Sequence, residues 1–182
     1  MRSLKAWGLR LLVLAGIVLL CRLSGSWRPA IAFALTWGPN YPFLGAVMIG
    51  ALRLPRALVP VHAIEAKLYR WAGVGLVKRL VTSRGWLLLV GLEQPPRLAS
   101  RDATLDRAEQ LTRGAEMCHL AALVFAAVIT LLFITGGGTA FAAWTLAMNI
   151  ALNCYPVMLQ RSNRWRVQQL RARHPEGDGG VA

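Results

Sequence analysis

The sequence predicts an all-α, polytopic membrane protein with about four transmembrane helices and a cytoplasmic, amphipathic middle segment. Of its 182 residues, 55% are hydrophobic and only 16% are charged, whereas soluble domains are roughly 45–50% apolar. The charged residues gather into blocks that leave long neutral stretches between them, and the basic residues flank these stretches. The length suits one domain, which we place over residues 1–182.

Four stretches are predicted to cross a hydrocarbon core about 30 Å thick: residues 6–23, 29–52, 118–135 and 139–159. Because no small-residue cleavage site follows the first stretch, an uncleaved signal anchor is favoured over a signal peptide. The second stretch contains Gly38-Pro39-Asn40-Tyr41-Pro42, which indicates a kinked span or, alternatively, a re-entrant hairpin. Gly136-Gly137-Gly138 indicates a tight turn between the last two spans.

The positions of Lys and Arg predict the orientation. A net charge of +13 can indicate nucleic acid or an anionic membrane surface. Since the basic residues lie beside apolar runs, we favour the membrane and expect no nucleic-acid partner. The positive-inside rule places both termini, the interfacial segment 53–117 and the basic tail 160–182 in the cytoplasm.

The interfacial segment is predicted to contain helices. Ile64, Leu68 and Trp71 have the spacing of an amphipathic helix that lies on the membrane. The apolar run 85–91 is too short to span and is predicted to be a re-entrant or packing segment. A further helix is expected from about Ala103 into the third span, supported by Glu109 and Arg113 at i,i+4.

No metal site is expected. The three cysteines, Cys21, Cys118 and Cys154, have an odd number and a spacing that fits no metal-ligand pattern. We therefore predict packing cysteines.

The first candidate site is the pair Glu116 and His119, which lie three residues apart and hence on one helical face. A carboxylate beside an imidazole can orient the ring and raise its basicity, as a general base requires. The alternative is a hydrated pair at the membrane interface with no chemical role.

The second candidate is a stripe of carboxamides on the fourth span. At 100° per residue, Asn149, Asn153, Gln160 and Asn163 fall within a sector of roughly 80°. Pro156 lies in the same sector and frees the carbonyl of Leu152 from its helical partner. The stripe is interpreted either as a polar pocket or as helix–helix hydrogen bonding.

An arginine-rich sequence follows this stripe and contains Arg161, Arg164 and Arg166. Guanidinium groups suit the phosphates of a ligand. The alternative is a positively charged anchor that holds the span in place.

Three motifs in the C-terminal half point to a family: Ala115-Glu116-Met117-Cys118-His119, Asn153-Cys154-Tyr155-Pro156 and Gln160-Arg161-Ser162-Asn163-Arg164-Trp165-Arg166. They resemble A-E-x-x-H, N-x-x-P and Q-R-Y-N-R-x-R of the glycosyl-4,4'-diaponeurosporenoate acyltransferases, small membrane proteins of bacterial, staphyloxanthin-type carotenoid biosynthesis. The resemblance extends over most of residues 37–173, and Glu65, Tyr69 and Lys78 also fall at similar positions. Ser162 departs from the usual Tyr of the family.

The resemblance implies an acyltransferase of the bacterial inner membrane that esterifies a sugar hydroxyl of a lipid-linked glycoside. His119, oriented by Glu116, is then the catalytic base. No cofactor is bound, and acyl-CoA or a similar activated acyl donor is the co-substrate. The implied partners are membrane lipids, the lipid-linked glycoside and pathway enzymes. The expected substrate-binding residues are Asn149, Asn153, Gln160, Asn163, Arg161, Arg164 and Arg166.

Two other functions stay open at this stage. A non-catalytic membrane scaffold or assembly protein would use the carboxamides to bind partner helices. Another small lipid-modifying transferase, such as a methyltransferase, would act on a different substrate. The acceptor, the acyl donor and the oligomeric state are left open.

Overall fold

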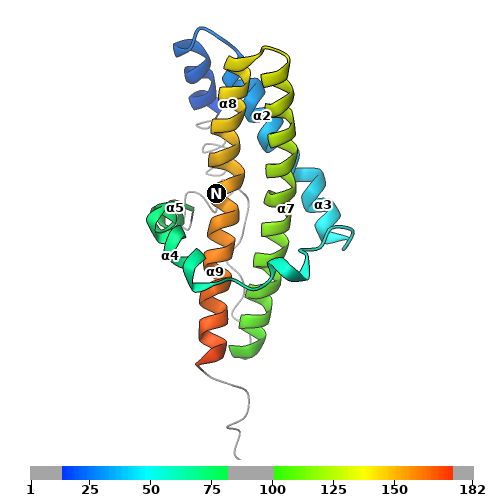
Figure 1. The fold of residues 1–182 in the computed structure, drawn as a ribbon, viewed down its shortest axis with the longest axis vertical. Coiled ribbons are helices and arrows are strands. Elements are labelled where there is room, and N and C mark those ends of the chain that lie inside the picture. Colours follow the sequence, from blue (N-terminus) through cyan, green and yellow to red (C-terminus); the bar gives the residue numbers. More distant parts are fainter. Residues whose placement is uncertain (1–13, 82–100, 174–182) are drawn as a thin grey trace, which may run out of the picture.

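The computed structural model describes residues 14–81 and 101–173, and every regular element within these ranges is a helix. The long helix α7 (Arg101–Thr135) packs side by side with a second rod (Figure 1). This rod consists of α8 (Thr139–Asn149), the π-helix η2 (Ile150–Cys154) and α9 (Tyr155–Ala172). The prediction of an all-α fold is confirmed for the described part of the chain.

The predicted glycine turn joins the two rods. Gly137 has a φ of +77°, a left-handed conformation that favours glycine because other residues place a Cβ against the backbone. The N–H of Gly138 donates to the carbonyl of Phe133 at 2.7 Å, which closes the end of α7. Phe133 and Phe141 stack across the turn with ring centroids 4.9 Å apart, so the two rods are held in register at this end.

The predicted break in the second stretch is confirmed, but it divides that stretch into two short helices. Helix α2 (Arg28–Trp37) packs mainly on α8, and α3 (Asn40–Met48) packs on α7. A Cβ at Gly38 would lie 2.6 Å from the carbonyl oxygen of Ala34, and Pro39 follows directly, so the helix ends here. At 1.5 Å per residue each piece reaches about 15 Å, half of a hydrocarbon core.

Two described helices, not the predicted four, are long and apolar enough to cross a membrane: Leu105–Thr135 and Thr139–Ala172. The prediction of about four transmembrane helices is therefore not confirmed in the described residues, where stretch 29–52, expected as a kinked span or a re-entrant hairpin, is divided at Gly38 and Pro39. Of the first predicted span, the structure describes the short apolar helix Leu14–Leu23. Residues 6–13, the apolar run 85–91 and the tail beyond residue 173 lie outside the described residues.

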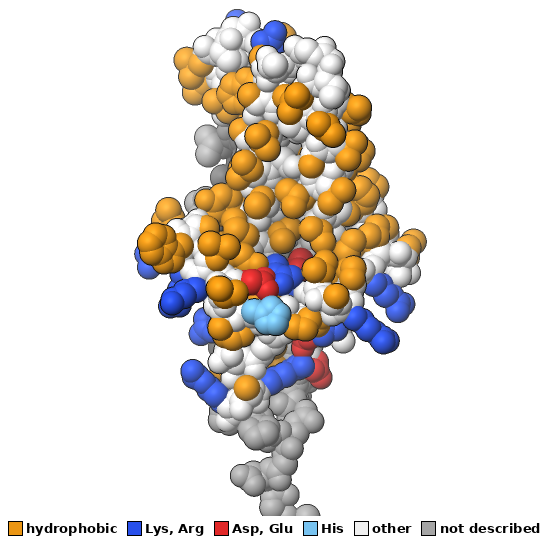
Figure 2. Space-filling view, viewed as in Figure 1, with side chains coloured by type: hydrophobic (Ala, Val, Ile, Leu, Met, Phe, Trp, Pro, Cys, Tyr) orange, Lys and Arg blue, Asp and Glu red, His pale blue; other side chains and the backbone are white. Residues whose placement is uncertain are grey.

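Many of the large apolar side chains of α7 face outward. Phe125, Val128, Leu131 and Leu132 are between 41% and 60% exposed. Figure 2 shows a mostly hydrophobic surface over the part that contains the glycine turn, and charged side chains gathered toward the opposite end of the rods. A core helix of a soluble protein would bury these side chains, so this surface suits hydrocarbon better than water.

The segment after α3 wraps around α9 near the charged end of the molecule (Figure 1). It comprises the 3₁₀ turn η1 (Arg56–Leu58), α4 (Ala63–Trp71) and α5 (Val74–Val81). Tyr69 and Val74 pack against Leu159 of α9. This apolar contact fixes the helical hairpin α4–α5 on the rod and brings its polar residues to the site described next.

Candidate functional site

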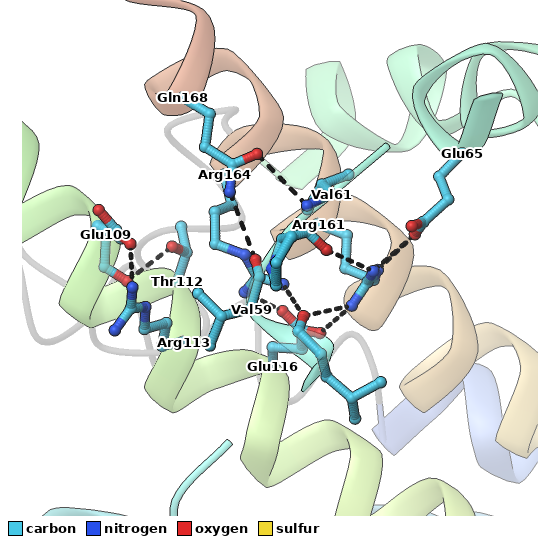
Figure 3. Close-up of polar contacts among 12 residues, drawn as sticks. Val59, Val61, Glu65, Glu109, Thr112, Arg113, Glu116, Arg161, Arg164 and Gln168 are labelled. Carbon is cyan, nitrogen blue, oxygen red and sulfur yellow. Dashed lines mark hydrogen bonds and ion pairs between the residues drawn. The ribbon is translucent and has the colours of Figure 1, made fainter. Parts of the chain in front are cut away.

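Five side chains from three helices form a buried cluster of charges, here called the ion-pair cluster: Glu65 and Tyr69 of α4, Glu116 of α7, and Arg161 and Arg164 of α9. Arg161 lies between the two carboxylates (Figure 3): its Nη2 is 2.7 Å from Glu65 Oε2, and its Nη1 is 2.9 Å from Glu116 Oε1. The other oxygen of Glu116 pairs with Arg164. The cluster therefore ties α4, α7 and α9 together.

The cluster is electrically balanced, with two carboxylates facing two guanidiniums. This balance matters because the Glu116 side chain is 1% exposed and that of Arg164 is 0% exposed. A buried charge without a partner would cost several kcal/mol. One donor is left over: Arg164 Nε is the buried side-chain N or O atom of the described residues that has no hydrogen-bond partner.

The two arginines also bind the chain segment that precedes α4. Arg161 Nη1 donates to the Leu58 carbonyl at 2.9 Å, and Arg164 Nη2 donates to the same oxygen at 3.0 Å. One turn further along α9, Gln168 Nε2 donates to the Val59 carbonyl and its Oε1 accepts the Val61 N–H, both at 3.4 Å. This face of α9 therefore supplies hydrogen-bond partners for backbone groups of the segment 58–61 that lie outside the α-helices.

Tyr69 and Glu65 report on the electrostatics of the cluster. The Tyr69 hydroxyl donates to Glu65 Oε2 at 2.8 Å, and burial together with this hydrogen bond raises the pKa of Tyr69 to about 12. Burial alone would raise the pKa of Glu65, but hydrogen bonds from Tyr69 and Arg161 outweigh it and leave that pKa below the ordinary value. The structure therefore holds Glu65 ionised and Tyr69 protonated.

A second polar group lies on the apolar side of the ion-pair cluster and is here called the amide network: Asn40, Cys118, His119, Asn149 and Asn153. At its centre Asn153 is fully buried. Its Nδ2 donates to the Thr36 carbonyl at 3.2 Å and to Asn149 Oδ1 at 3.0 Å. Its Oδ1 accepts the Nδ2 of Asn40 at 3.1 Å and lies 3.3 Å from His119 Nδ1. Asn153, in the π-helix, thus contacts α2, α3, α7 and α8.

The helix breaks explain why these groups meet. Pro156 has no N–H, so the Leu152 carbonyl lacks its usual helical donor, and the turn before the proline widens into the π-helix η2. The ring of His119 lies beside this widened turn, with its Nδ1 3.3 Å from Asn153 Oδ1. Asn40 reaches Asn153 because Gly38 and Pro39 end α2 there. Two irregular turns from distant parts of the chain therefore meet directly, beside α7.

The expected orientation of His119 by Glu116 is wrong. In the described structure both carboxylate oxygens of Glu116 are taken by Arg161 and Arg164, and the Nδ1 of His119 lies 3.3 Å from Asn153 Oδ1. The spacing does place both residues on one face of α7. However, the guanidiniums of α9 are stronger partners for a buried carboxylate than a neutral imidazole is.

The predicted stripe of four carboxamides divides into two groups. Asn149 and Asn153 belong to the amide network, and Asn149 also donates to the Leu123 carbonyl at 3.0 Å. Asn163 instead accepts a hydrogen bond from Lys78 of α5 at 2.9 Å, and Gln160 is half-buried on α9. The π-helix is the physical reason, because its wider turn changes the direction of every later side chain.

The three predicted anion-binding arginines differ in their surroundings. Arg164 is fully buried and Arg161 is engaged by Glu65 and Glu116, so neither is available to a ligand in this arrangement. Arg166 is exposed and lies near enough to Lys78 to contribute to the lowered pKa of that ammonium, behind the larger effect of burial. Among the described residues, no group of three His, Cys, Asp or Glu side chains is placed to hold a metal ion.

Sequence reasoning missed Asn40 and did not assign roles to Glu65 and Tyr69. A signal for Asn40 was present, because it is the one carboxamide in stretch 29–52 and stands in the proline-rich break. Glu65 and Tyr69 stand at i,i+4, a spacing that places them on one face of α4. Their partner Arg161 is 96 residues away from Glu65, so the sequence alone gave no means of pairing them.

A family model described as glycosyl-4,4'-diaponeurosporenoate acyltransferase matches residues 55–173. No curated protein and no solved structure matches the chain. The matched range includes both rods, the ion-pair cluster and His119, but it leaves out Asn40.

Proposed function

Because this chain belongs to the glycosyl-4,4'-diaponeurosporenoate acyltransferase family, we propose that it is a membrane enzyme that esterifies a sugar hydroxyl of a lipid-linked glycoside with a fatty acyl group. The observation that carries the proposal is the placement of His119, an ionisable side chain in the A-E-x-x-H motif, on an apolar helix and inside the amide network. Such a group is costly among apolar residues and marks a functional site.

His119 is the proposed general base. With Nδ1 bound to Asn153 Oδ1, the other ring nitrogen, Nε2, is the atom that takes the proton of the sugar hydroxyl. The hydroxyl oxygen attacks the acyl carbonyl of an activated donor such as an acyl thioester. The carbon–sulfur bond then breaks, and the proton moves from His119 to the departing thiolate.

The buried carboxamides act on the substrate through His119 and not by contact. Asn153 is fully buried and Asn149 is 3% exposed, and their hydrogen bonds go to groups of the chain itself. They are positioning residues that fix the ring and its tautomer. Gln160, which is half-buried, is the carboxamide that we assign to the sugar or the acyl carbonyl.

The ion-pair cluster is the proposed scaffold of the site. Arg161 and Arg164 hold α4, α7 and the segment 58–61 against α9, so the anionic end of the acyl donor needs another cation. Arg166 is exposed and remains our assignment for that role. The two apolar substrates stay in the bilayer beside the exposed side chains of the long helices, with the cytoplasmic orientation expected from the basic residues.

A non-catalytic scaffold is disfavoured by the same contacts. A scaffold that recognised partner helices through its carboxamides would present their hydrogen-bonding groups to the outside. Asn149 and Asn153 instead use theirs within this chain.

The test is replacement of His119 by Gln and by Ala in the membrane-reconstituted protein, supplied with the glycosyl carotenoid acid and a fatty acyl-CoA. We expect ester formation to fall by at least about 100-fold, the lower end of a general base's contribution. His62→Ala is the matched control, because His62 is exposed at the start of α4. Full turnover by both His119 variants, with normal folding, would remove His119 from the mechanism.

A further inference from the structure

Helix α4 has two faces with different tasks. Its inner face carries Glu65 and Tyr69, which bind Arg161. On the outward side Ile64, Leu68 and Trp71 are 77%, 65% and 89% exposed. At 100° per residue these three fall within a sector of about 60°, so they form one apolar strip that nothing in the described structure covers.

Two cations border this strip. Lys67 and Arg70 line a shallow hollow together with Trp71, with a volume of about 500 Å³. The six ion pairs among described residues involve neither of these cations. Glu65 is the one acidic residue of α4, and it is held by Arg161. The outer face of α4 is therefore apolar and positively charged.

The position of this face along the rods is also informative. Figure 2 shows, at the place that α4 and α5 occupy in Figure 1, hydrophobic side chains with Lys and Arg side chains next to them on the side away from the glycine turn. This level is where the apolar surface of the rods gives way to the charged end. An interfacial helix needs this arrangement, with an apolar strip toward the acyl chains and cations at the headgroups.

We propose that the outer face of α4 docks on the bilayer, with Trp71 at the headgroup level, and that Lys67 and Arg70 bind the phosphate of an anionic phospholipid. The proposal rests on the membrane placement in the proposed function but not on the acyl-transfer reaction. Trp suits this level because its ring is apolar and its indole N–H finds polar partners there. Docking presses Glu65 and Tyr69 toward Arg161, so lipid binding and the ion-pair cluster stabilise each other.

The test uses the full chain in vesicles whose lipids carry bromine near the headgroup, which quenches nearby Trp fluorescence. The fluorescence of the wild type minus that of the Trp71→Phe variant isolates the signal of Trp71. We expect strong quenching with about one third phosphatidylglycerol, and at least about tenfold less docking in the variant with Lys67→Gln and Arg70→Gln, since each interfacial cation contributes about fivefold. The matched control, Arg107→Gln with Arg173→Gln, removes two exposed cations elsewhere and should change nothing.

Each other outcome overturns the proposal. Equal quenching in phosphatidylcholine alone, whose headgroup has no net charge, would mean docking without a site for an anionic phospholipid, and an unquenched Trp71 would mean that this face does not meet the bilayer. Trp144 of α8 reports separately on the membrane placement. Its signal is isolated in the same way through Trp144→Phe, and bromine deeper in the acyl chains should quench it if the rods lie in the bilayer. If Trp144 is quenched and Trp71 is not, only the docking of α4 is wrong.

Discussion

The ion-pair cluster and the amide network lie about one helical turn apart, because Glu116 and His119 are three residues apart on α7, yet they are built differently. The ion-pair cluster opposes two carboxylates to two guanidiniums and joins the interfacial helix α4 to the rods. The amide network is uncharged apart from the ionisable ring of His119. The neighbouring polar groups therefore have different partners: the charges join α4, α7 and α9, and the carboxamide of Asn153 lies against the ring of His119, the proposed base.

Substitution of Glu116 should give the largest effect on stability. Glu116→Gln leaves the positive charge of Arg164 buried without compensation, and we expect the free energy of unfolding to fall by about 3–5 kcal/mol. Thermal unfolding in detergent measures it. The double variant Glu116→Gln with Arg164→Met should recover part of the loss, because it removes both buried charges. A single variant as stable as wild type would mean that the cluster does not hold the helices together.

Asn153→Leu should separate the two regions. The ring of His119 loses its partner, and a displacement of about 1 Å can cost about 100-fold in rate. We expect kcat to fall by about 100-fold, whereas the contacts among Tyr69, Glu65 and Arg161 stay in place. Activity assays together with thermal unfolding measure the division. Asn163→Leu is the control on the same rod, because its partner is Lys78. Equal loss of activity in both variants would contradict the positioning role.

Asn40→Ala should have a smaller effect in the same direction. It removes one of the hydrogen bonds to Asn153 Oδ1, worth about 1 kcal/mol or about fivefold in kcat. KM for both substrates should not change, because Asn40 is 8% exposed and touches Asn153 instead of a substrate. A change confined to KM would place Asn40 in a binding site.

The smallest effect concerns pH. Since the pKa of Glu65 in the folded protein lies below its ordinary value of 4.5, its contribution to stability is present above that value and is lost as the pH falls through the lower, folded-state value. Glu65→Gln should therefore lower the free energy of unfolding at neutral pH and make it depend less on pH on the acid side. Unfolding curves between neutral pH and about pH 3 measure it. An unchanged slope would show that Glu65 is not held by Tyr69 and Arg161.

The parts of the fold that depend on local chemistry were predictable from sequence. The glycine turn at Gly136–Gly138 and the break at Gly38 and Pro39 follow from backbone properties of single residues, and α4 follows from its apolar spacing. Fewer described helices than predicted are long enough to span, because the break at Gly38 and Pro39 was expected to kink one span or form a re-entrant hairpin and instead divides the stretch into two half-length helices.

The candidate site was predictable in composition but not in pairing. The carboxamides of the fourth stretch were interpreted as a polar pocket or as helix–helix hydrogen bonding, and Asn149 and Asn153 do bind the backbones of α7 and α2. Glu116 was expected beside His119, but the arginines of α9 compete for it more strongly. Uniform helical geometry placed Asn163 with Asn153, whereas the π-helix before Pro156 separates them. Pairing of this kind depends on which helices pack together, and that information is spread over the whole chain.

By itself the sequence determined where the helices break and which family motifs it carries. It also determined that the few polar residues of the apolar stretches turn away from lipid, because exposing them to hydrocarbon is costly. These features depend on residue type and short spacing. The tertiary structure alone decided which carboxylate meets which guanidinium and which amide holds the imidazole. The physical reason is that Glu65 and Arg161, or Asn40 and Asn153, lie about a hundred residues apart, and contacts at that separation exist only once the helices have packed.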